Sequence, residues 1–587
     1  MEVTRIFDIL SKYEHEFKPK EDVLSGKENG EWVKYDLKTY LEKADHISLG
    51  LLELGIKKGD KIATISNNRP EWNFIDMGIL QTGAIHVPIY PTISEDDYRY
   101  ILKHADVKLV FVAGKELLRK IEHILPEIDS IKQMYTIKKI DEHHHLSDLI
   151  ELGKQSKKIK EFEKIRSSIE KDDVATLIYT SGTTGFPKGV MLSHDNILSD
   201  VKAAFWIFPV DETSRGLSYL PLCHVYERTV NYILQYKGVS IYYAENMATI
   251  VDNIQEVKPH IMTTVPRLLE KVYDKILAKG RRLKGLKKQI FFWAVNLGLK
   301  YEYDRPDRIL YNAQLKIANK LVFNKWREAF GGEMRSIVSG GAALQPRLAR
   351  IYNAAGIPVV EGYGMTESSP VIAVNTYIPK QRKIGTVGPP LKNIEVKISK
   401  KGEILVKGPI VMKGYYKEPK MTSETVIDNW LHTGDMGVIE DGMLKITGRV
   451  KEIFKTSMGK YISPVLIENK IKESPFIDQI MVVGENQKWA AALIVPDFEH
   501  LRMWCKIKGI PYTSDKEMIN HKDYKNRIKK EVDCFNKQFG DTERIKKFEL
   551  IDHEWTIDTG EITANLKLKR ATLLKKYANL IDKIYNN

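Results

Sequence analysis

The chain has 587 residues, which is too long for one hydrophobic core, so at least two domains are expected. Hydrophobic residues make up 43% and charged residues 29%, a balance typical of a soluble globular protein, and no run of apolar residues is long enough for a membrane-spanning helix. The net charge of +14 leaves nucleic acid, an anionic membrane and anionic substrates open, but the basic residues lie along the chain among acidic ones, so we expect no nucleic-acid partner.

Targeting and redox signals favour the cytoplasm. Residues 1–5 lack the basic-then-apolar pattern of a signal peptide. Cys223, Cys505 and Cys534 show neither metal nor disulfide spacing, which suits a reducing compartment. We therefore expect a cytoplasmic protein, with peripheral contact at the inner face of the membrane left open.

The amino-terminal third alternates strand and helix patterns. Strands are predicted at 32–35, 61–66, 86–90 and 107–112, with helices at 37–54 and from about residue 70. This rhythm predicts an α/β fold with a parallel sheet covered by helices. The adjacent histidines at 143–145 are better explained by a solvated loop than by a metal site, because they cannot converge on one ion without ligands from elsewhere.

A loop rich in glycine and hydroxyl groups follows the apolar strand predicted at 174–179. Backbone N–H groups of such a loop can converge on an anion, and Lys188 adds a mobile positive charge. The spacing differs from that of a Walker loop, which requires Gly-Lys-Ser/Thr. We therefore predict a phosphate cradle, with a flexible surface turn as the alternative. Beyond it, Asp195-Asn196 is expected to cap a helix.

Two glycine turns follow later predicted strands. After the strand at 336–339, Gly340-Gly341 permits close backbone approach to a flat ligand. After the strand at 359–361 comes Gly-Tyr-Gly, followed by Thr366 and Glu367. Tyr363 can stack on a base, Thr366 can donate to a phosphate, and the Glu367 carboxylate suits Mg²⁺. A packed core tyrosine is the alternative for Tyr363.

The next segments predict a β-rich region. Residues 384–390 and 402–408 are expected to form short strands between turns. Asp435 follows a glycine in Thr-Gly-Asp and suits bidentate binding of ribose hydroxyls, and Arg449 follows in Thr-Gly-Arg. An exposed salt bridge between Asp435 and Arg449 is the alternative.

These stretches together resemble the adenylate-forming superfamily, which includes acyl-CoA synthetases, luciferases and the adenylation domains of peptide synthetases. The resemblance spans residues 30–575. The run from Leu220 to Arg228 is similar to the Leu-Pro-Leu-x-His-x-x-Glu-Arg signature of the long-chain acyl-CoA synthetases, and Val265-Pro266-Arg267 is similar to a motif whose helix walls the acyl pocket in that group.

The resemblance implies a fold and a domain division. It predicts a large domain at 1–448, with parallel-sheet subdomains and a small β-barrel, and a small mobile α+β domain at 449–587, with a hinge near Lys451. Near the end, Lys567 matches the catalytic lysine. The sequence departs from the pattern at Ala564-Asn565, where Pro-Thr is common, and the neighbouring Lys569 leaves the register of the lysine open.

The resemblance also implies the activity and its residues. ATP, Mg²⁺ and coenzyme A are expected with a fatty acid, which forms acyl-AMP and then acyl-CoA. Lys567, His224, Thr184 and Glu367 would be catalytic, Thr184 and Glu367 would hold the metal, and the acyl pocket would include His224, Val265, Gly341 and Gly364. The nucleotide would contact Thr180, Ser181, Gly182, Thr183, Thr184, Gly185, Lys188, Gly340, Gly341, Ala342, Glu361, Gly362, Tyr363, Gly364, Thr366, Asp435, Arg449 and Lys567.

Several alternatives stay open. The acyl group could pass to a carrier protein, or the substrate could be a shorter or aromatic acid. A basic binding protein with a decayed enzyme fold is a third reading, which the intact set of site residues disfavours. The basic stretch at 280–288 beside the aromatic cluster at 291–293 is a candidate interfacial helix, with core packing of the aromatics as the alternative. Chain length and oligomeric state, including a homodimer, are not given by the sequence.

Overall fold

The computed structural model describes the chain except for residues 1, 181–186, 306, 557–558, 564–566 and 587. Two compact units are distinguished. The first comprises Met1–Lys397, Leu405–Thr433 and Asp441–Leu444, and the second comprises Ile398–Ile404, Gly434–Glu440 and Lys445–Asn587. No helix in the described part of the chain is long and apolar enough to cross a bilayer.

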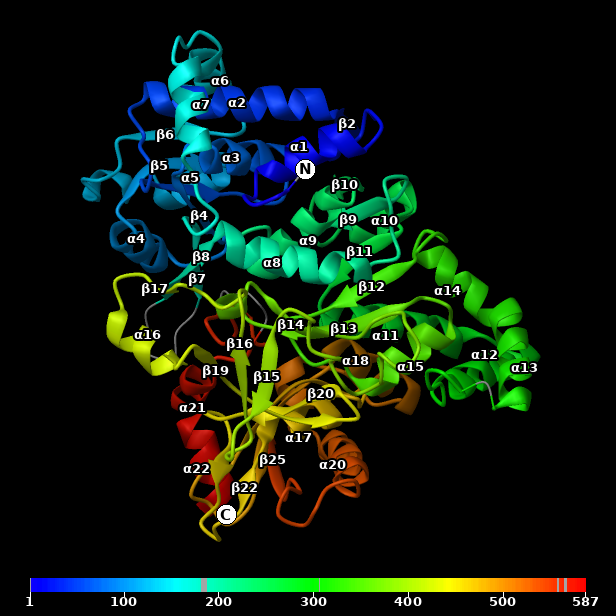
Figure 1. The fold of residues 1–587 in the computed structure, drawn as a ribbon. Helices are drawn as coiled ribbons and strands as arrows, with labels where there is room; N and C mark the ends of the chain where they lie inside the picture. Colours follow the sequence, from blue (N-terminus) through cyan, green and yellow to red (C-terminus); the bar gives the residue numbers. More distant parts are fainter. Residues whose placement is uncertain (1, 181–186, 306, 557–558, 564–566, 587) are drawn as a thin grey trace. The chain divides into compact units, whose positions relative to one another are not determined.

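A seven-stranded sheet lies in the first part of the first unit (Figure 1). Its order is β17 (Gly414–Tyr415), β8 (Lys188–Ser193), β7 (Val174–Thr180), β4 (Ile85–Ile89), β3 (Lys61–Ile65), β5 (Val107–Val112) and β6 (Gln133–Thr136). The strands from β7 to β6 are parallel, whereas β8 is antiparallel to both β7 and β17. The strands predicted at 61–66, 86–90 and 107–112 are confirmed.

An eight-stranded sheet forms the rest of the first unit's framework. Its order is β14 (Val371–Val374), β13 (Val359–Gly364), β12 (Ser336–Ser339), β11 (Ile261–Thr264), β9 (Arg215–Ser218), β10 (Ser240–Tyr243), β1 (Leu24–Glu28) and β2 (Glu31–Tyr35). The six inner strands are parallel, and the edge strands β14 and β2 are antiparallel to their neighbours. The fold of this unit is therefore α/β with parallel sheets, as predicted.

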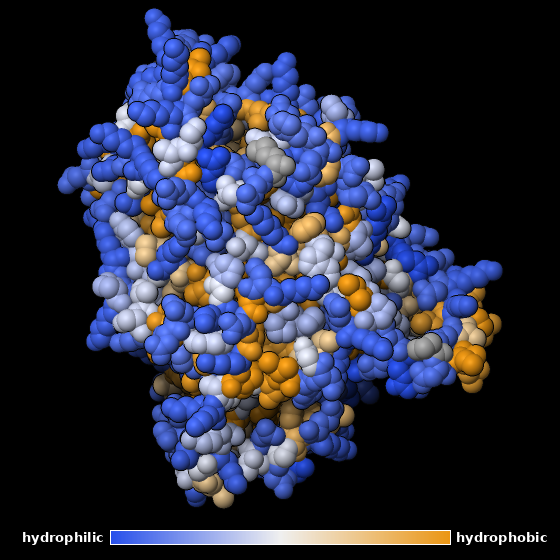
Figure 2. Space-filling model, in the orientation of Figure 1, coloured by the Kyte–Doolittle hydropathy of each residue, from blue (hydrophilic) through white to orange (hydrophobic). Residues whose placement is uncertain are grey.

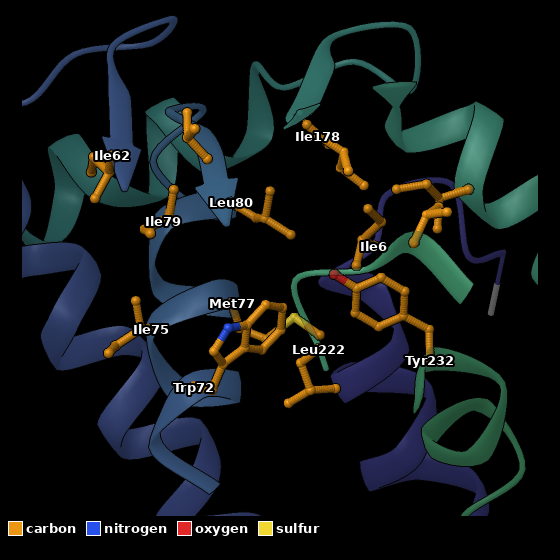
Figure 3. Packing of buried hydrophobic residues seen from close by; sticks show 14 of the residues in the cluster. Ile6, Ile62, Trp72, Ile75, Met77, Ile79, Leu80, Ile178, Leu222 and Tyr232 are labelled. Carbon is orange, nitrogen blue, oxygen red and sulfur yellow. The ribbon is translucent and has the colours of Figure 1, made fainter. Parts of the chain in front are cut away.

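Helices bury the apolar faces of these sheets. Helix α3 (Pro70–Leu80) is buried along almost its whole length, because both sides of the helix are apolar. Figure 3 shows Trp72 and Met77 of α3 directed toward Leu222 and toward Tyr232 of α9 (Val225–Tyr236). These side chains belong to one large cluster, so α9 is packed into the same core as the seven-stranded sheet.

The other helices of the first unit have well-defined bounds. They are α1 (Asp8–Glu16), α2 (Leu37–Glu53), α4 (Glu95–His104), α5 (Lys115–Ile121), α6 (Leu146–Lys154), α7 (Ile159–Ser167), α8 (His194–Ala204), α10 (Ile250–Val257), α11 (Pro266–Arg282), α12 (Gly285–Gly298), α13 (Ile309–Ala318), α14 (Asn324–Ala329), α15 (Pro346–Ala354) and α16 (Pro419–Thr425). A single π-helical segment, η3 (Asn319–Phe323), joins α13 to α14.

Two local predictions need correction. Helix α8 is capped by Ser193, whose hydroxyl accepts from the backbone of Asn196 while the Asn196 side chain returns a bond to Ser193; Asp195-Asn196 therefore lies inside the first turn. Residues 384–390 form turns and not a strand, because Gly385 and Gly388 adopt positive φ angles of 83° and 84°. His145 caps α6, in agreement with a non-metal role for the histidine run.

The strands expected to build the small β-barrel form a five-stranded sheet. It contains β15 (Glu395–Ile398), β16 (Glu403–Lys407), β18 (Val426–Ile427), β19 (Trp430–Glu440) and β20 (Met443–Arg449). Strand β16 matches the expected segment at 402–408.

The second unit has an α+β core. A three-stranded sheet joins β23 (Ile477–Val483), β24 (Ala491–Pro496) and β25 (Lys547–Leu550), and a short ribbon pairs β21 (Phe454–Lys455) with β22 (Tyr461–Ile462). The helices are α17 (Pro464–Ile471), α18 (Phe498–Lys508), α19 (Asp515–Met518), α20 (Lys522–Asn536), α21 (Arg570–Lys576) and α22 (Ala578–Asn586). Two clusters of buried side chains lie on the strands and helices of this unit.

Candidate functional site

The stem of the predicted phosphate loop is a β-hairpin. Strands β7 and β8 pair as far as Thr180 and Lys188, which are partners in the antiparallel register. Ser181, Gly182, Thr183, Thr184 and Gly185 lie outside the described residues, so their predicted roles stay predictions. The hairpin register places Lys188 at the end of a strand whose neighbour carries Tyr415.

Lys188, Tyr415 and Glu367 come together beside this hairpin. The Lys188 Nζ lies 5.1 Å from the centre of the Tyr415 ring. The Tyr415 hydroxyl donates to Glu367 Oε1 at 2.7 Å, and burial together with the Glu367 charge raises the pKa of Tyr415, so this hydroxyl keeps its proton. Glu367 and Thr366 are buried in a short 3₁₀ turn that follows β13. A cation, a hydroxyl and a carboxylate thus occupy one location.

The glycine turn after β12 is held by a buried carboxylate. Glu361 Oε1 accepts a hydrogen bond of 2.8 Å from the backbone N–H of Leu344, which lies just beyond Gly340, Gly341 and Ala342. Burial raises the pKa of Glu361 to about 8. Gly341 is exposed and has φ of 79°, which a side chain would strain. Glu361 therefore supports the turn through its backbone.

The Gly-Tyr-Gly segment is the end of strand β13. Tyr363 is partly exposed, which differs from the fully packed core tyrosine considered as the alternative. A Cβ at Gly364 would overlap the carbonyl oxygen of Pro370, whereas a Cβ at Gly362 would meet its nearest atom, Cγ2 of Val374, at 3.5 Å. Gly364 is thus required by the close approach of two chain segments, and Gly362 is not.

The predicted acyl-pocket residues lie on connected elements. His224 caps α9, and its Nδ1 accepts from the backbone N–H of Tyr226 at 3.2 Å. The Tyr226 ring lies against Gly340, and its hydroxyl donates to the Val338 carbonyl at 2.9 Å. Val265 Cγ1 would lie 3.7 Å from a Cβ built on Gly341. Val265 therefore borders the glycine turn, and His224 is connected to that turn through Tyr226.

A buried ionic network holds α9 in place. Arg228 donates to Asp76 Oδ1 at 2.5 Å and to Thr176 of β7 at 2.8 Å, and His86 Nδ1 lies 2.6 Å from Asp76 Oδ1. Burial opposes ionisation of Asp76, but the Arg228 charge and the bonds from His86 and Tyr232 lower its pKa. Burial lowers the pKa of His86, which keeps the ring neutral. The network thus contains one carboxylate and one guanidinium.

The neighbouring Glu227 has a different environment. It accepts hydrogen bonds from Ser218 at 2.6 Å and from Thr263, which anchor α9 to strands β9 and β11 of the eight-stranded sheet. Burial raises the pKa of Glu227 to about 7. The Glu-Arg pair that follows the signature histidine therefore joins the helix to both large sheets.

The second unit contains the predicted ribose-binding pair. Arg449 Nε donates to Asp435 Oδ1 at 2.8 Å, and Asp435 is buried while Arg449 is exposed. Lys451 lies in the exposed turn after β20. The pair is consistent both with a ribose site and with a structural ion pair, so its predicted role stays a prediction.

The predicted catalytic lysine lies in a closed loop of the second unit. The carbonyl of Lys567 accepts from the N–H of Thr563 at 2.8 Å, and the N–H of Lys567 donates to Thr563 Oγ1 at 3.1 Å. Its side chain is exposed. Arg570, at the start of α21, instead binds Glu468 Oε2 at 2.5 Å and lies 3.4 Å from Glu452, so it has a structural contact at each end of its guanidinium.

Sequence reasoning missed two supporting residues. One is Tyr415, which nothing in the sequence pairs with Glu367, 48 positions away. Asn68 binds the Leu220 carbonyl at 2.6 Å and the Leu222 N–H at 2.9 Å, and so fixes the segment that leads to His224. An asparagine two residues before a proline, at a predicted helix start, was the available signal, but it does not identify the partner of the asparagine.

Comparison with known proteins now decides the family. The AMP-binding enzyme family matches residues 15–416, and the AMP-binding enzyme C-terminal domain matches residues 451–587. The chain belongs to the AMP-binding enzyme family. Its members are adenylate-forming enzymes that use ATP, as the phosphate cradle and the site residues led us to expect.

Similar proteins from the family cover most of the chain. The long-chain-fatty-acid–CoA ligase FadD15 of Mycobacterium bovis is 33% identical over 93% of this chain and 92% of its own length. The human long-chain-fatty-acid–CoA ligase 1 is 31% identical over 95% of this chain and 82% of its own length.

Solved structures of the family share the fold. The adenylation domain of a carboxylate reductase from Mycobacterium chelonae is 19% identical, has a TM-score of 0.78 and covers 99% of this chain and 91% of that chain. A fatty acyl CoA synthetase of Mycobacterium tuberculosis is 20% identical, has a TM-score of 0.63 and covers 98% of this chain and 99% of that chain. These matches confirm the expected fold class.

Proposed function

We propose that this protein is an ATP-dependent long-chain fatty acid–CoA ligase that forms acyl-CoA, AMP and pyrophosphate. The observation that carries the proposal is the convergence of Lys188, Tyr415 and Glu367 beside the phosphate-loop hairpin. It is supported by 31–33% identity, over most of the chain, to enzymes named long-chain-fatty-acid–CoA ligases.

The reaction has two displacements. A fatty acid carboxylate oxygen attacks the α-phosphorus of ATP, the bond to the bridging oxygen breaks, and pyrophosphate leaves. The CoA thiol then loses its proton and attacks the acyl carbonyl carbon, and AMP leaves with the acyl–oxygen bond electrons. Negative charge grows on phosphate oxygens in the first step, so a cation placed at the nucleotide lowers the barrier. Among the described residues of the first unit, Lys188 supplies this positive charge.

The residues of the first unit fit Mg²⁺ held between protein and phosphates. Among the described residues, no group of three or more His, Cys, Asp or Glu side chains could hold a metal ion by itself. Mg²⁺ in phosphoryl-transfer sites does not need such a group, because it characteristically binds one or two carboxylates together with phosphate and water oxygens. Glu367 would provide that carboxylate, with Thr184 as the second expected ligand, and Tyr415 fixes its orientation. When bound, the ion would neutralise phosphate charge.

Lys567 is proposed to contribute the second positive charge in the adenylation step, and the turn at Lys451 is proposed as the hinge between domains at 1–448 and 449–587. The Lys567 side chain is exposed while its backbone is held by two bonds to Thr563, one to the Thr563 N–H and one to the Thr563 hydroxyl, which suits a residue that must be presented to a ligand. Proline at Lys451 restricts φ and tests the hinge. Normal turnover of Lys451→Pro in both half-reactions would remove the hinge from the proposal.

The test is AMP and pyrophosphate release from ATP with saturated acids from butyric to eicosanoic acid, with and without CoA. The expected result is AMP release that requires CoA and peaks with long chains. Lys188→Ala and Glu367→Gln should both abolish it, while Lys413→Ala, on the same chain segment as Tyr415 but paired with Asp172 at the surface, should not.

Other outcomes assign the alternatives. Pyrophosphate release with trapped acyl-AMP and no response to CoA would move the acceptor to a carrier protein. A peak with short or aromatic acids would change the substrate class and leave adenylate formation intact. Absence of ATP turnover with all acids would overturn the proposal.

A further inference from the structure

The positive charge of this protein is concentrated in one segment. Residues 275–327 contain fourteen Lys and Arg but three Asp and Glu, a net charge of +11, whereas the whole chain has a net charge of +14. The expectation that the basic residues lie along the chain among acidic ones is therefore wrong for this segment. The other residues together are close to neutral.

The three acidic residues of the segment are already paired. Glu302 binds Arg350, Asp304 binds Arg382 and Asp307 binds Arg305, at 2.5, 2.7 and 2.8 Å. Two of these partners lie outside the segment. The lysines of the segment are largely exposed, among them Lys284, Lys287, Lys288, Lys300, Lys316, Lys320 and Lys325. The segment thus presents a positive surface whose own carboxylates do not neutralise it.

The segment folds as the helical layer from the end of α11 to α14. Its inner side belongs to a core cluster that includes Phe291, Val295, Phe323 and Trp326. The aromatic residues considered for an interfacial helix at 280–298 therefore face the core: Phe291 is buried, and Phe292 and Trp293 are partly buried against the same cluster. The core-packing alternative is confirmed for these aromatics.

The outer side of α13 and η3 carries a row of exposed apolar side chains. Ile309, Leu310, Ile317 and Leu321 are 79%, 74%, 53% and 53% exposed. Ile309, Ile317 and Leu321 are separated by multiples of four residues, with the exposed Ala313 between the first two, and this spacing places them along one side of the helical segment. Figure 2 shows apolar atoms at the edge of the molecule where Figure 1 places α12 and α13.

A second pair of exposed apolar residues adjoins the lysines of α12. Leu283, in the connection from α11 to α12, is 36% exposed, and Leu286, in the first turn of α12, is 70% exposed. Helix α12 packs against both α13 and η3. We call the exposed faces of α13 and η3 together with residues 282–288 the basic apolar face.

We propose that the basic apolar face docks on the surface of an anionic phospholipid bilayer. The exposed lysines attract anionic headgroups, and apolar side chains that project beyond them enter the boundary between headgroups and acyl chains. Nucleic acid matches the charge but offers protruding isoleucine and leucine side chains no apolar environment in its phosphate backbone. The combination of both features on one face therefore favours the bilayer, and it would bring the enzyme to the phase in which long acyl chains reside.

The first experiment measures sedimentation of the full-length protein with vesicles of phosphatidylcholine containing phosphatidylglycerol. The parent protein should bind these vesicles at least tenfold more tightly than vesicles of pure phosphatidylcholine, and less tightly at high salt. Two variants test the face. One carries Ile309→Ser, Leu310→Ser, Ile317→Ser and Leu321→Ser, and the other carries Lys287→Gln, Lys288→Gln, Lys316→Gln and Lys320→Gln. Each should weaken binding at least tenfold.

Matched controls change the same residue types elsewhere. Ile159, Met247, Val251 and Ile507 are 50–74% exposed and are replaced by Ser together. Lys38, Lys154, Lys529 and Lys583 have side chains that are 53–83% exposed and are replaced by Gln together. Both control proteins should bind vesicles like the parent. CoA-dependent AMP release, measured without vesicles on a dissolved fatty acid, should be unchanged in all four variants, which separates this proposal from the proposed function.

A second experiment locates the contact directly. In a Cys534→Ser background the remaining Cys223 and Cys505 are buried, so Leu310→Cys can carry an environment-sensitive dye. Dye emission should shift to shorter wavelength when anionic vesicles are added, whereas the same dye at Ile507→Cys should not respond.

Three results would overturn the proposal. The first is equal vesicle binding by the parent and both face variants. The second is the absence of parent binding to anionic vesicles. The third is tight, salt-sensitive binding of duplex DNA that the lysine variant loses while the dye at position 310 shows no response to vesicles.

Discussion

The Tyr415 hydroxyl donates a 2.7 Å hydrogen bond to the carboxylate of Glu367 from a strand that also neighbours Lys188. Between Glu367 and Tyr415 the chain forms β14 of the eight-stranded sheet and then β15 and β16 of the five-stranded sheet. The predicted metal ligand is therefore oriented by β17, a strand that pairs with β8 of the phosphate-loop stem.

Replacing Tyr415 by Phe should lower kcat/KM for acyl-AMP formation about tenfold, because a charge-assisted hydrogen bond of about 1.5–3 kcal/mol is lost at a buried carboxylate. The dependence of the rate on Mg²⁺ concentration should change as well. Tyr416→Phe is the matched control, since that neighbouring ring has no recorded bond to Glu367 among the described residues. Equal Mg²⁺ dependence in both variants would contradict the orienting role.

The two glycines of the Gly-Tyr-Gly segment should differ in tolerance. Gly364→Ala places a methyl group on the Pro370 carbonyl and should reduce soluble yield or activity by a hundredfold or more. In Gly362→Ala the new methyl group makes ordinary van der Waals contacts, so soluble yield and activity should both stay within a few fold of the parent. Expression, circular dichroism and pyrophosphate release on the two variants give the comparison. An active, folded Gly364→Ala would show that the two segments can separate without consequence.

Glu361 should make stability depend on pH. Its pKa is raised by burial to about 8 from an ordinary 4.5, so between these values the folded protein binds more protons than the unfolded chain. The free energy of unfolding should therefore fall as pH rises from about 4.5 and level off above about 8. The total change is on the order of 5 kcal/mol, because one pKa unit corresponds to about 1.4 kcal/mol.

Glu361→Gln removes this titration and keeps an acceptor for the Leu344 N–H. Urea midpoints at pH 6, 7, 8 and 9 should show a smaller slope for this variant than for the parent. The exposed Glu328→Gln serves as the control and should keep the parental slope. Any loss of stability from the unpaired amide of the glutamine is independent of pH. If the urea midpoint of Glu361→Gln depends on pH as strongly as that of the parent, Glu361 is not the group that titrates.

The buried pair of Asp76 and Arg228 should be sensitive to loss of one partner. Arg228→Met leaves the Asp76 carboxylate buried without its cation and should cost about 3–5 kcal/mol of unfolding free energy. The double change Asp76→Asn with Arg228→Met should restore part of this loss. Arg99→Met, which breaks a surface pair with Glu127, should leave the urea midpoint nearly unchanged. Additive losses in the double variant would exclude a direct coupling between the two.

Lys567 should act in one half-reaction. Lys567→Ala should slow acyl-AMP formation about a hundredfold, the usual effect of removing one charge-stabilising group. Thioester formation from supplied acyl-AMP and CoA should stay within a few fold of the parent. Lys569→Ala is the control, since Lys569 lies beside the first residue of α21 and is the other lysine in register. If Lys569→Ala shows the larger loss of acyl-AMP formation, Lys569 and not Lys567 is the catalytic lysine.

The fold class and several site elements could be predicted because they depend on local patterns. Val107–Val112 is apolar except for Lys108 and is rich in β-branched residues, and it forms the predicted strand with the predicted bounds. Strand β13 begins at the predicted Val359, but it runs through the Gly-Tyr-Gly segment to Gly364, three residues beyond the predicted end. Such features need only the residues next to each other in the chain.

The misplaced features depend on partners far away in sequence. The Asp76–Arg228 pair spans 152 positions, and no periodicity links a buried aspartate to a particular arginine. A different cause applies at 384–390. A strand was predicted there from the apolar residues, but Gly385 and Gly388 have positive φ angles, which are incompatible with a strand. The exposed row on α13 was missed because the aromatic cluster of α12 was the stronger apolar signal, and its burial becomes visible only in the folded chain.

The anchoring of α9 to both large sheets bears on attempts to redesign substrate choice. Tyr226 connects the helix to β12, Glu227 connects it to β9 and β11, and Arg228 connects it to β7. The position of His224, which caps this helix, is therefore fixed relative to both large sheets. A mutant library over α9 would therefore return mostly misfolded proteins. Helix α11, which is proposed to wall the acyl pocket, carries partly buried Leu268, Val272 and Ile276 against a core cluster. On that proposal, varying these three residues is the more productive route to a new acyl-length profile.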